Sequence, residues 1–228
     1  MESVKKRQWY KDPPIIIAII ALAISIVSPV VAQKNLASDR ERQDQTRLVE
    51  LIQQLPGLRN NNASTTDQFA LVASEATQLM KRLPATPDQK LQVADAWKNA
   101  GDLLTAKELL ESALTEATGS FQKATILRTL ASIEFELQDY RAGRVDYERA
   151  IHTEETEMPG NLRFYFSVQD QLRWGNDELF QAGNCHGARQ NAQQAKALLS
   201  HFLNPSNFWG DVGGDIRKFE ADIAKNCK

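Results

Sequence analysis

A long apolar stretch near the N-terminus constrains this chain more than any other feature of its sequence. Residues 13–33 contain no charged side chain, and seven of these 21 residues are isoleucine. A helix of this length reaches about 31 Å, close to the hydrocarbon thickness of a bilayer. We therefore expect a transmembrane helix over residues 14–33, in contact with membrane lipid. The mean hydropathy of the whole chain is still −0.43, so the remainder is distinctly polar.

A cleaved signal peptide is the alternative interpretation of the same stretch. Lys5, Lys6 and Arg7 form a basic region before it, and residues 30–32 (Val-Val-Ala) offer a small-residue cleavage site. We favour a retained anchor, because the uncharged run is long for a signal peptide. Both interpretations send the rest of the chain across the membrane.

Positive charges alone do not orient this segment. Four lysines and arginines precede the expected helix, and four follow it closely. Exporting a short, positively charged tail is unfavourable, whereas long downstream domains translocate largely regardless of charge. We expect a single-pass membrane protein in which residues 1–13 form a cytosolic tail and the larger part is extracytoplasmic.

The rest of the chain has the composition of a helical protein. Only six isoleucines and six valines occur among the 195 residues after position 33, too few β-branched residues for an extensive sheet. Apolar residues between Asp67 and Leu83 recur at intervals of three and four, and Pro84 ends that pattern. Thr86, followed by a proline and by Gln89 three positions later, predicts the start of the next helix. The fold class is expected to be all-α.

Shorter patterns divide this helical part into three segments. Residues 34–63 are predicted to form a charged stalk helix with a linker, and residues 64–204 the main helical domain. Residues 205–228 carry a last apolar stripe, at Ile216, Phe219 and Ile223, that predicts a capping helix. A short stripe from Leu48 to Leu55 is expected to pack on the helix that follows, although it could instead join two copies of the chain.

Weak internal similarity runs through the main domain. The dipeptides Gly101-Asp102 and Gln138-Asp139 align, with large and small residues at matching positions after them, and a weaker third copy begins at Gly183-Asn184. A short turn of this kind joins two helices of a hairpin. The pattern resembles the tetratricopeptide repeat family over about residues 87–200, although the spacings of 37 and 45 residues depart from the 34 of that family. An unrelated helical bundle remains the alternative.

The resemblance implies a groove that binds extended or helical peptides, lined by the first helix of each hairpin. Two guanidinium groups beside two aromatic rings would suit a peptide that carries a carboxylate. Alternatively, the arginines are solvated and the phenylalanines belong to the core. Transferred position by position, the groove candidates are Leu91, Asp95, Lys98, Arg128, Ser132, Phe135, Arg173, Asp177 and Phe180.

The two cysteines, Cys185 and Cys227, form a candidate disulfide. In an exported domain, oxidation would tie the capping helix to the last hairpin. Two separate buried thiols are the alternative.

The sequence predicts a binding protein that is not an enzyme. It contains no phosphate-binding glycine loop, no HExxH or GxSxG motif and no cysteine–histidine pattern with metal spacing, so we expect no cofactor and no metal site. The net charge of −2 excludes a globally basic nucleic-acid binder. We expect a membrane-anchored scaffold or adaptor for protein or peptide partners. The alternatives are a self-assembling structural component, a secreted helical protein and an enzyme whose site is built from scattered residues.

Overall fold

The computed structural model describes residues 38–58, 66–201 and 211–227. Every regular element within these ranges is a helix, as the composition predicts. The expected membrane span over residues 14–33 and the tail before it lie outside the described residues. In the part that is described, no helix combines the length and the apolar character that a bilayer crossing needs.

The contacts of the chain divide it into residues 1–49 and residues 50–228. A helical run over residues 38–58 includes the boundary, and its residues Leu51, Ile52 and Leu55 are buried within the second unit. All further features described here belong to this second unit. Its helices are α2 (Thr66–Met80), α3 (Pro87–Asn99), α4 (Leu103–Glu116), α5 (Ser120–Glu136), α6 (Tyr140–Glu157), α7 (Gly160–Phe180), α8 (Cys185–Leu199) and α9 (Val212–Asn226).

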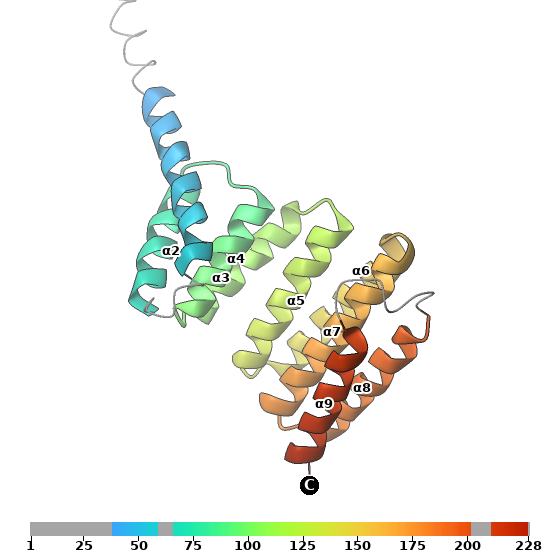
Figure 1. The fold of residues 1–228 in the computed structure, drawn as a ribbon. Helices are drawn as coiled ribbons and strands as arrows, with labels where there is room; N and C mark the ends of the chain where they lie inside the picture. Colours follow the sequence, from blue (N-terminus) through green and yellow to red (C-terminus); the bar gives the residue numbers. More distant parts are fainter. Residues whose placement is uncertain (1–37, 59–65, 202–210, 228) are drawn as a thin grey trace, which may run out of the picture. The chain divides into compact units, whose positions relative to one another are not determined.

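Helices α3 to α8 form three successive antiparallel hairpins, α3/α4, α5/α6 and α7/α8 (Figure 1). Each helix packs on its neighbours in sequence, and the first helices of successive hairpins, α3, α5 and α7, also contact one another. The expected capping box is present at the start of α3, where Thr86 and Gln89 each accept a hydrogen bond from the backbone of the other. The domain is therefore a stack of helix pairs.

The turns inside the three hairpins share one local geometry. Asp102, Asp139 and Asn184 cap α4, α6 and α8, and each side chain accepts a hydrogen bond from the backbone N–H three residues later. The residue before each cap has a positive φ of 83°, 65° and 63°, at Gly101, Gln138 and Gly183 respectively. A positive φ costs a residue with a side chain about 1–2 kcal/mol, and glycine fills this position in two of the three turns. The third turn thus has the same geometry as the first two, although its sequence similarity is weak.

The unequal repeat spacing arises from helix length. Helices α4 and α5 have 14 and 17 residues, whereas α6 and α7 have 18 and 21. This eight-residue difference, about two helical turns, accounts for the whole increase in spacing from 37 to 45 residues. The longer spacing between the second and third turns therefore comes from longer helices and not from a longer loop.

Small residues let the helices of a hairpin approach closely. Ala94 and Ala106 are fully buried in the first hairpin, where large side chains such as Leu110 fill the remaining space. In the second hairpin a Cβ atom at Gly143 would lie 2.5 Å from the ring of Phe135. The ring therefore occupies the space that a methyl group would need.

Helix α9 covers the last hairpin, packing against α7 and α8. Its buried residues Val212, Ile216, Phe219 and Ile223 belong to one core cluster with those two helices. The ring of Phe219 lies directly over Gly175, where a Cβ atom would come within 2.4 Å of it.

Candidate functional site

A cavity of about 520 Å³ lies along the first helices of the three hairpins. Helices α3, α5 and α7 supply nearly all of its lining, and α6 contributes Tyr147. The structure brings together in this cavity most of the residues that the repeat register selects. These are Leu91, Asp95, Lys98, Arg128, Ser132, Arg173 and Asp177.

The two phenylalanines of the predicted groove do not line this cavity. Phe135 is 1% exposed and packs in the core beside Tyr140 and Tyr147, with ring centroids 5.6 and 6.1 Å away. Phe180 is 57% exposed at the end of α7. Their shared repeat position therefore leads to two different environments, one in the core and one on the surface.

The cations of the cavity differ in how they are paired. The Lys98 ammonium lies 2.8 Å from Glu136 and donates to Ser132 at 2.9 Å, so α3 is tied to α5. The Arg173 side chain is exposed and makes no hydrogen bond or ion pair with any described residue. Arg173 is thus the guanidinium that this cavity leaves available to a ligand.

Asp177 lies beside Arg173 on the next turn of α7. Its Oδ2 accepts a hydrogen bond of 2.6 Å from the Tyr147 hydroxyl, whose ring is buried in the core. Burial raises the pKa of Asp177 to about 6, although the bond from Tyr147 opposes this shift. The charge of the cavity therefore changes in the mildly acidic range.

Arg128 lines the cavity but is buried, so the alternative that this arginine is solvated is wrong. Its side chain is buried, and its Nη2 donates to Glu154 of α6 at 2.7 Å. Its Nε lies 3.2 Å from Asp170 of α7, and its Cζ is 5.7 Å from the ring centre of Phe166. The sequence analysis did not identify Glu154 or Asp170, because acidic residues within charged helices give no signal of burial.

A second, more apolar cavity of about 370 Å³ adjoins the first. Leu55 and Phe69 lie at one side of it, while Asp95 and Asn99 line both cavities. The two cavities therefore share part of one wall, formed by α3.

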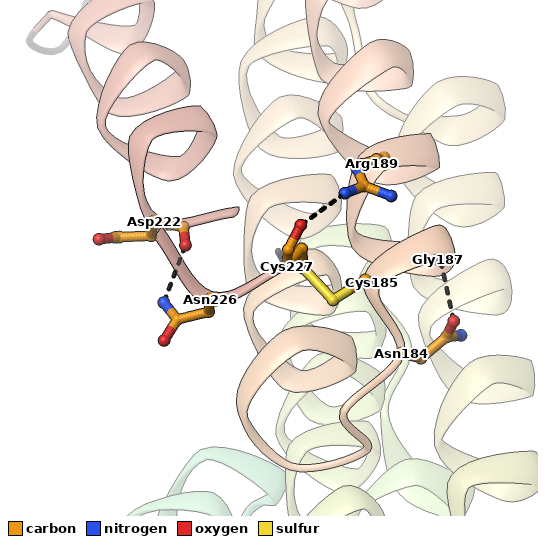
Figure 2. The surroundings of a disulfide bond; sticks show 7 residues. All are labelled: Asn184, Cys185, Gly187, Arg189, Asp222, Asn226 and Cys227. Atoms are coloured by element: carbon orange, nitrogen blue, oxygen red, sulfur yellow. Dashed lines mark hydrogen bonds between the residues drawn. A yellow bond between two sulfur atoms is a disulfide. The ribbon is translucent and has the colours of Figure 1, made fainter. Parts of the chain in front are cut away.

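The two cysteines meet at the start of α8 (Figure 2). The Sγ atoms of Cys185 and Cys227 are 2.04 Å apart, which is a disulfide bond between the start of α8 and the residue after α9. Arg189 of α8 donates a hydrogen bond of 3.0 Å to the carbonyl oxygen of Cys227. Both cysteine sulfurs are thereby occupied, and the described residues contain no group of three or more side chains that could hold a metal ion.

The architecture defines an all-helical domain of stacked antiparallel helix pairs. No family model matches the sequence, and no curated protein matches it. Among solved structures, the crystal structure of BtubC (BKLC) from P. vanneervenii is similar at 16% sequence identity and a TM-score of 0.46. That alignment covers 81% of this chain and 89% of the other.

Proposed function

We propose that this protein is a scaffold that binds an extended, acidic peptide segment of a partner protein along α3, α5 and α7. The observation that carries the proposal is the Arg173 guanidinium, unpaired within the described residues and placed on a cavity of about 520 Å³. A guanidinium presents paired donors that match the geometry of a carboxylate. The adjoining cavity at Leu55 and Phe69 would take an apolar side chain of the same segment.

Selection of random peptides on the full-length protein in lipid nanodiscs tests this proposal. The selected peptides should be enriched in aspartate and glutamate, and Arg173→Ala should weaken their binding about tenfold, the loss of about 1.4 kcal/mol. Arg149→Ala is the matched control, because Arg149 pairs with Asp146 on α6 and does not line the cavity. Peptides without acidic enrichment, or equal losses in both variants, would contradict the proposed site.

A second part of the proposal concerns where in the cell the protein lies. We propose that residues 14–33 anchor the chain in a membrane as a single span and that the helical domain is extracytoplasmic. The uncharged run supports the anchor, and the Cys185–Cys227 bond supports an oxidising compartment. The alternatives are a secreted protein with a cleaved signal peptide and a self-assembling membrane component.

Three measurements, on native membranes and on sealed cells, separate these possibilities. An anchored chain resists carbonate extraction and keeps Met1 at its N-terminus or loses only that residue, whereas a cleaved chain begins after the apolar run. Protease added outside sealed cells should digest the helical domain if it is extracytoplasmic. A photo-crosslinker at Thr129, in the cavity, should give adducts that Arg173→Ala reduces. Adducts with a second copy of the chain would favour self-assembly.

A further inference from the structure

Three ionisable side chains meet in the interior where α5, α6 and α7 pack together. Arg128 comes from α5, Glu154 from α6 and Asp170 from α7. Both carboxyl groups are fully buried, and the arginine is 7% exposed. Arg128 Nη2 donates to Glu154 Oε1 at 2.7 Å, and Arg128 Nε lies 3.2 Å from Asp170 Oδ1. One guanidinium thus faces two carboxyl groups away from water.

The hydrogen bonds of this cluster are incomplete if both carboxyl groups are ionised. Glu154 Oε2 and both oxygens of Asp170 have no donor among the described residues. An ionised carboxylate can only accept hydrogen bonds, so a buried oxygen without a donor is destabilising. The cluster would also carry a net charge of −1 in a site of low dielectric. A single retained proton supplies a donor and removes the excess charge.

We propose that Glu154 and Asp170 share one proton at neutral pH, so that with Arg128 they form an uncharged cluster that holds α5, α6 and α7 together and loosens when the proton leaves. The cluster lies directly behind the cavity, since Arg128 belongs to both. Loss of the proton would therefore weaken the packing of α7, the helix that carries Arg173.

The groups that face the pair come from all three helices. Arg128 of α5 and Arg173 of α7 favour the ionised forms, while Ser167 of α7 lies beside Glu154, and Tyr147 of α6 is close enough to respond to Asp170. Burial raises the pKa of Glu154 to about 9, and the charge of Asp170 adds to this. Burial also raises the pKa of Asp170 to about 6, against the effect of Arg128.

The direction of the pH effect follows from these shifts. The pKa of Glu154 is higher in the folded chain than its ordinary value of 4.5, so between these values the folded state binds a proton that the unfolded state lacks. Stability from this group is fully present below pH 4.5 and is lost as the pH rises through about 9. A neutral side chain of the same shape at this position should remove that loss.

Glu154→Gln provides such a side chain. Its amide can donate to Asp170 and its carbonyl can accept from Arg128, which mimics the protonated acid at every pH. In the full-length protein in detergent, we expect this variant to unfold at a higher temperature than the wild type at pH 8 to 9, with the difference shrinking toward pH 5.

Glu178→Gln is the matched control, because Glu178 is equally buried but accepts four hydrogen bonds. It should unfold at a lower temperature than the wild type at pH 8 to 9. If Glu154→Gln is destabilised to the same degree, or if its difference from the wild type does not change with pH, the shared proton is wrong.

Infrared spectroscopy of the wild type shows directly whether a buried carboxyl group is protonated. It does not depend on whether a variant folds. A protonated carboxyl has a carbonyl stretching band that an ionised one lacks. We expect this band at pH 8, its disappearance above about pH 9, and its loss at pH 8 in Glu154→Gln or Asp170→Asn. A wild type without the band at pH 8 would overturn the proposal.

Discussion

Glu154 and Glu178 lie on neighbouring helices, and each faces an arginine from the preceding helix. Arg128 donates one hydrogen bond to Glu154, whose Oε2 has no donor within the described residues. Glu178 accepts two bonds from Arg144, at 2.6 and 2.9 Å, and one each from Trp174 and Asn184. Burial by itself favours a higher pKa at both carboxyl groups. The pKa of Glu154 is raised, whereas at Glu178 the hydrogen bonds outweigh burial and the pKa is lowered.

The difference shows that burial alone does not determine the charge of a carboxyl group. Glu154 is 0% and Glu178 is 2% exposed, so solvent access does not distinguish them. Their partners do: four hydrogen bonds to the ionised form of Glu178 offset the cost of desolvation, whereas Glu154 accepts fewer and also faces the charge of Asp170. Glu178 can therefore keep its charge, whereas Glu154 is stable only with a proton.

The largest effect is expected from removing the disulfide bond, which lies near Glu178. Asn184, a donor to Glu178, directly precedes Cys185. Replacing both cysteines by serine should lower the free energy of unfolding by about 4 kcal/mol, since the bond closes a loop across a sequence separation of 42 residues. Denaturant titration of the full-length protein in detergent measures the loss.

Thiol titration provides the control for that experiment. The unfolded, unreduced wild type should contain no free thiol, because its two cysteines are bonded to each other. Two free thiols would contradict the bond. The pH dependence that we assign to Glu154 should persist in the serine variant, because Glu154 contacts neither cysteine.

Glu178→Gln should have the next largest effect. It removes the charge from a carboxylate that Arg144 binds with two hydrogen bonds, and we expect a loss of about 2 kcal/mol at pH 7. The lowered pKa means that Glu178 stabilises the folded state above its ordinary value of 4.5 and that this stability is lost as the pH falls below it. The deficit of the variant should therefore shrink in acid, as the advantage of Glu154→Gln also does, but the two variants differ from the wild type in opposite directions.

Asp177 can be compared with these two glutamates, because it is a partly exposed carboxyl group with one hydrogen-bond donor, Tyr147. Its pKa of about 6 means that the cavity loses a negative charge as the pH falls through this value. An acidic peptide selected on the protein should bind about threefold more tightly at pH 5 than at pH 7, a difference of about 0.6 kcal/mol. Fluorescence anisotropy measures this change.

Asp177→Asn is the control for that pH dependence, because it fixes a neutral side chain in the cavity. The variant should bind the peptide equally at both pH values, at about the affinity of the wild type at pH 5. A variant with an unchanged pH dependence would assign the effect to another group.

The smallest effect is expected at an ion pair whose arginine is exposed to water. Arg149 lies 2.6 Å from Asp146, three residues earlier on α6, and its side chain is exposed. Arg149→Ala should cost about 0.5 kcal/mol, and less at high salt, because water screens the exposed guanidinium although Asp146 is buried. A loss as large as that of Glu178→Gln would show that donor number is not what separates these sites.

Much of the scaffold was predictable because it depends on short-range chemistry. The cap at Thr86 and the turns at Gly101 and Gly183 follow from which residues accept a bond from a nearby N–H or tolerate a positive φ, whereas the turn at Gln138 follows from its alignment with Gly101. The repeat register also selected Lys98, Arg173 and other cavity residues, since equivalent positions on stacked helices face the same side. The direction of each side chain was not predictable in this way, as Phe135 and Arg128 show.

The sequence by itself determined the helices and their turns, because these depend on residues within a few positions of one another. Only the tertiary structure decided which carboxyl groups are buried and how many donors reach them. Those donors come from other helices, such as Arg128 for Glu154 and Arg144 for Glu178. Their distances are set by the packing of whole hairpins, which no local pattern of residues encodes.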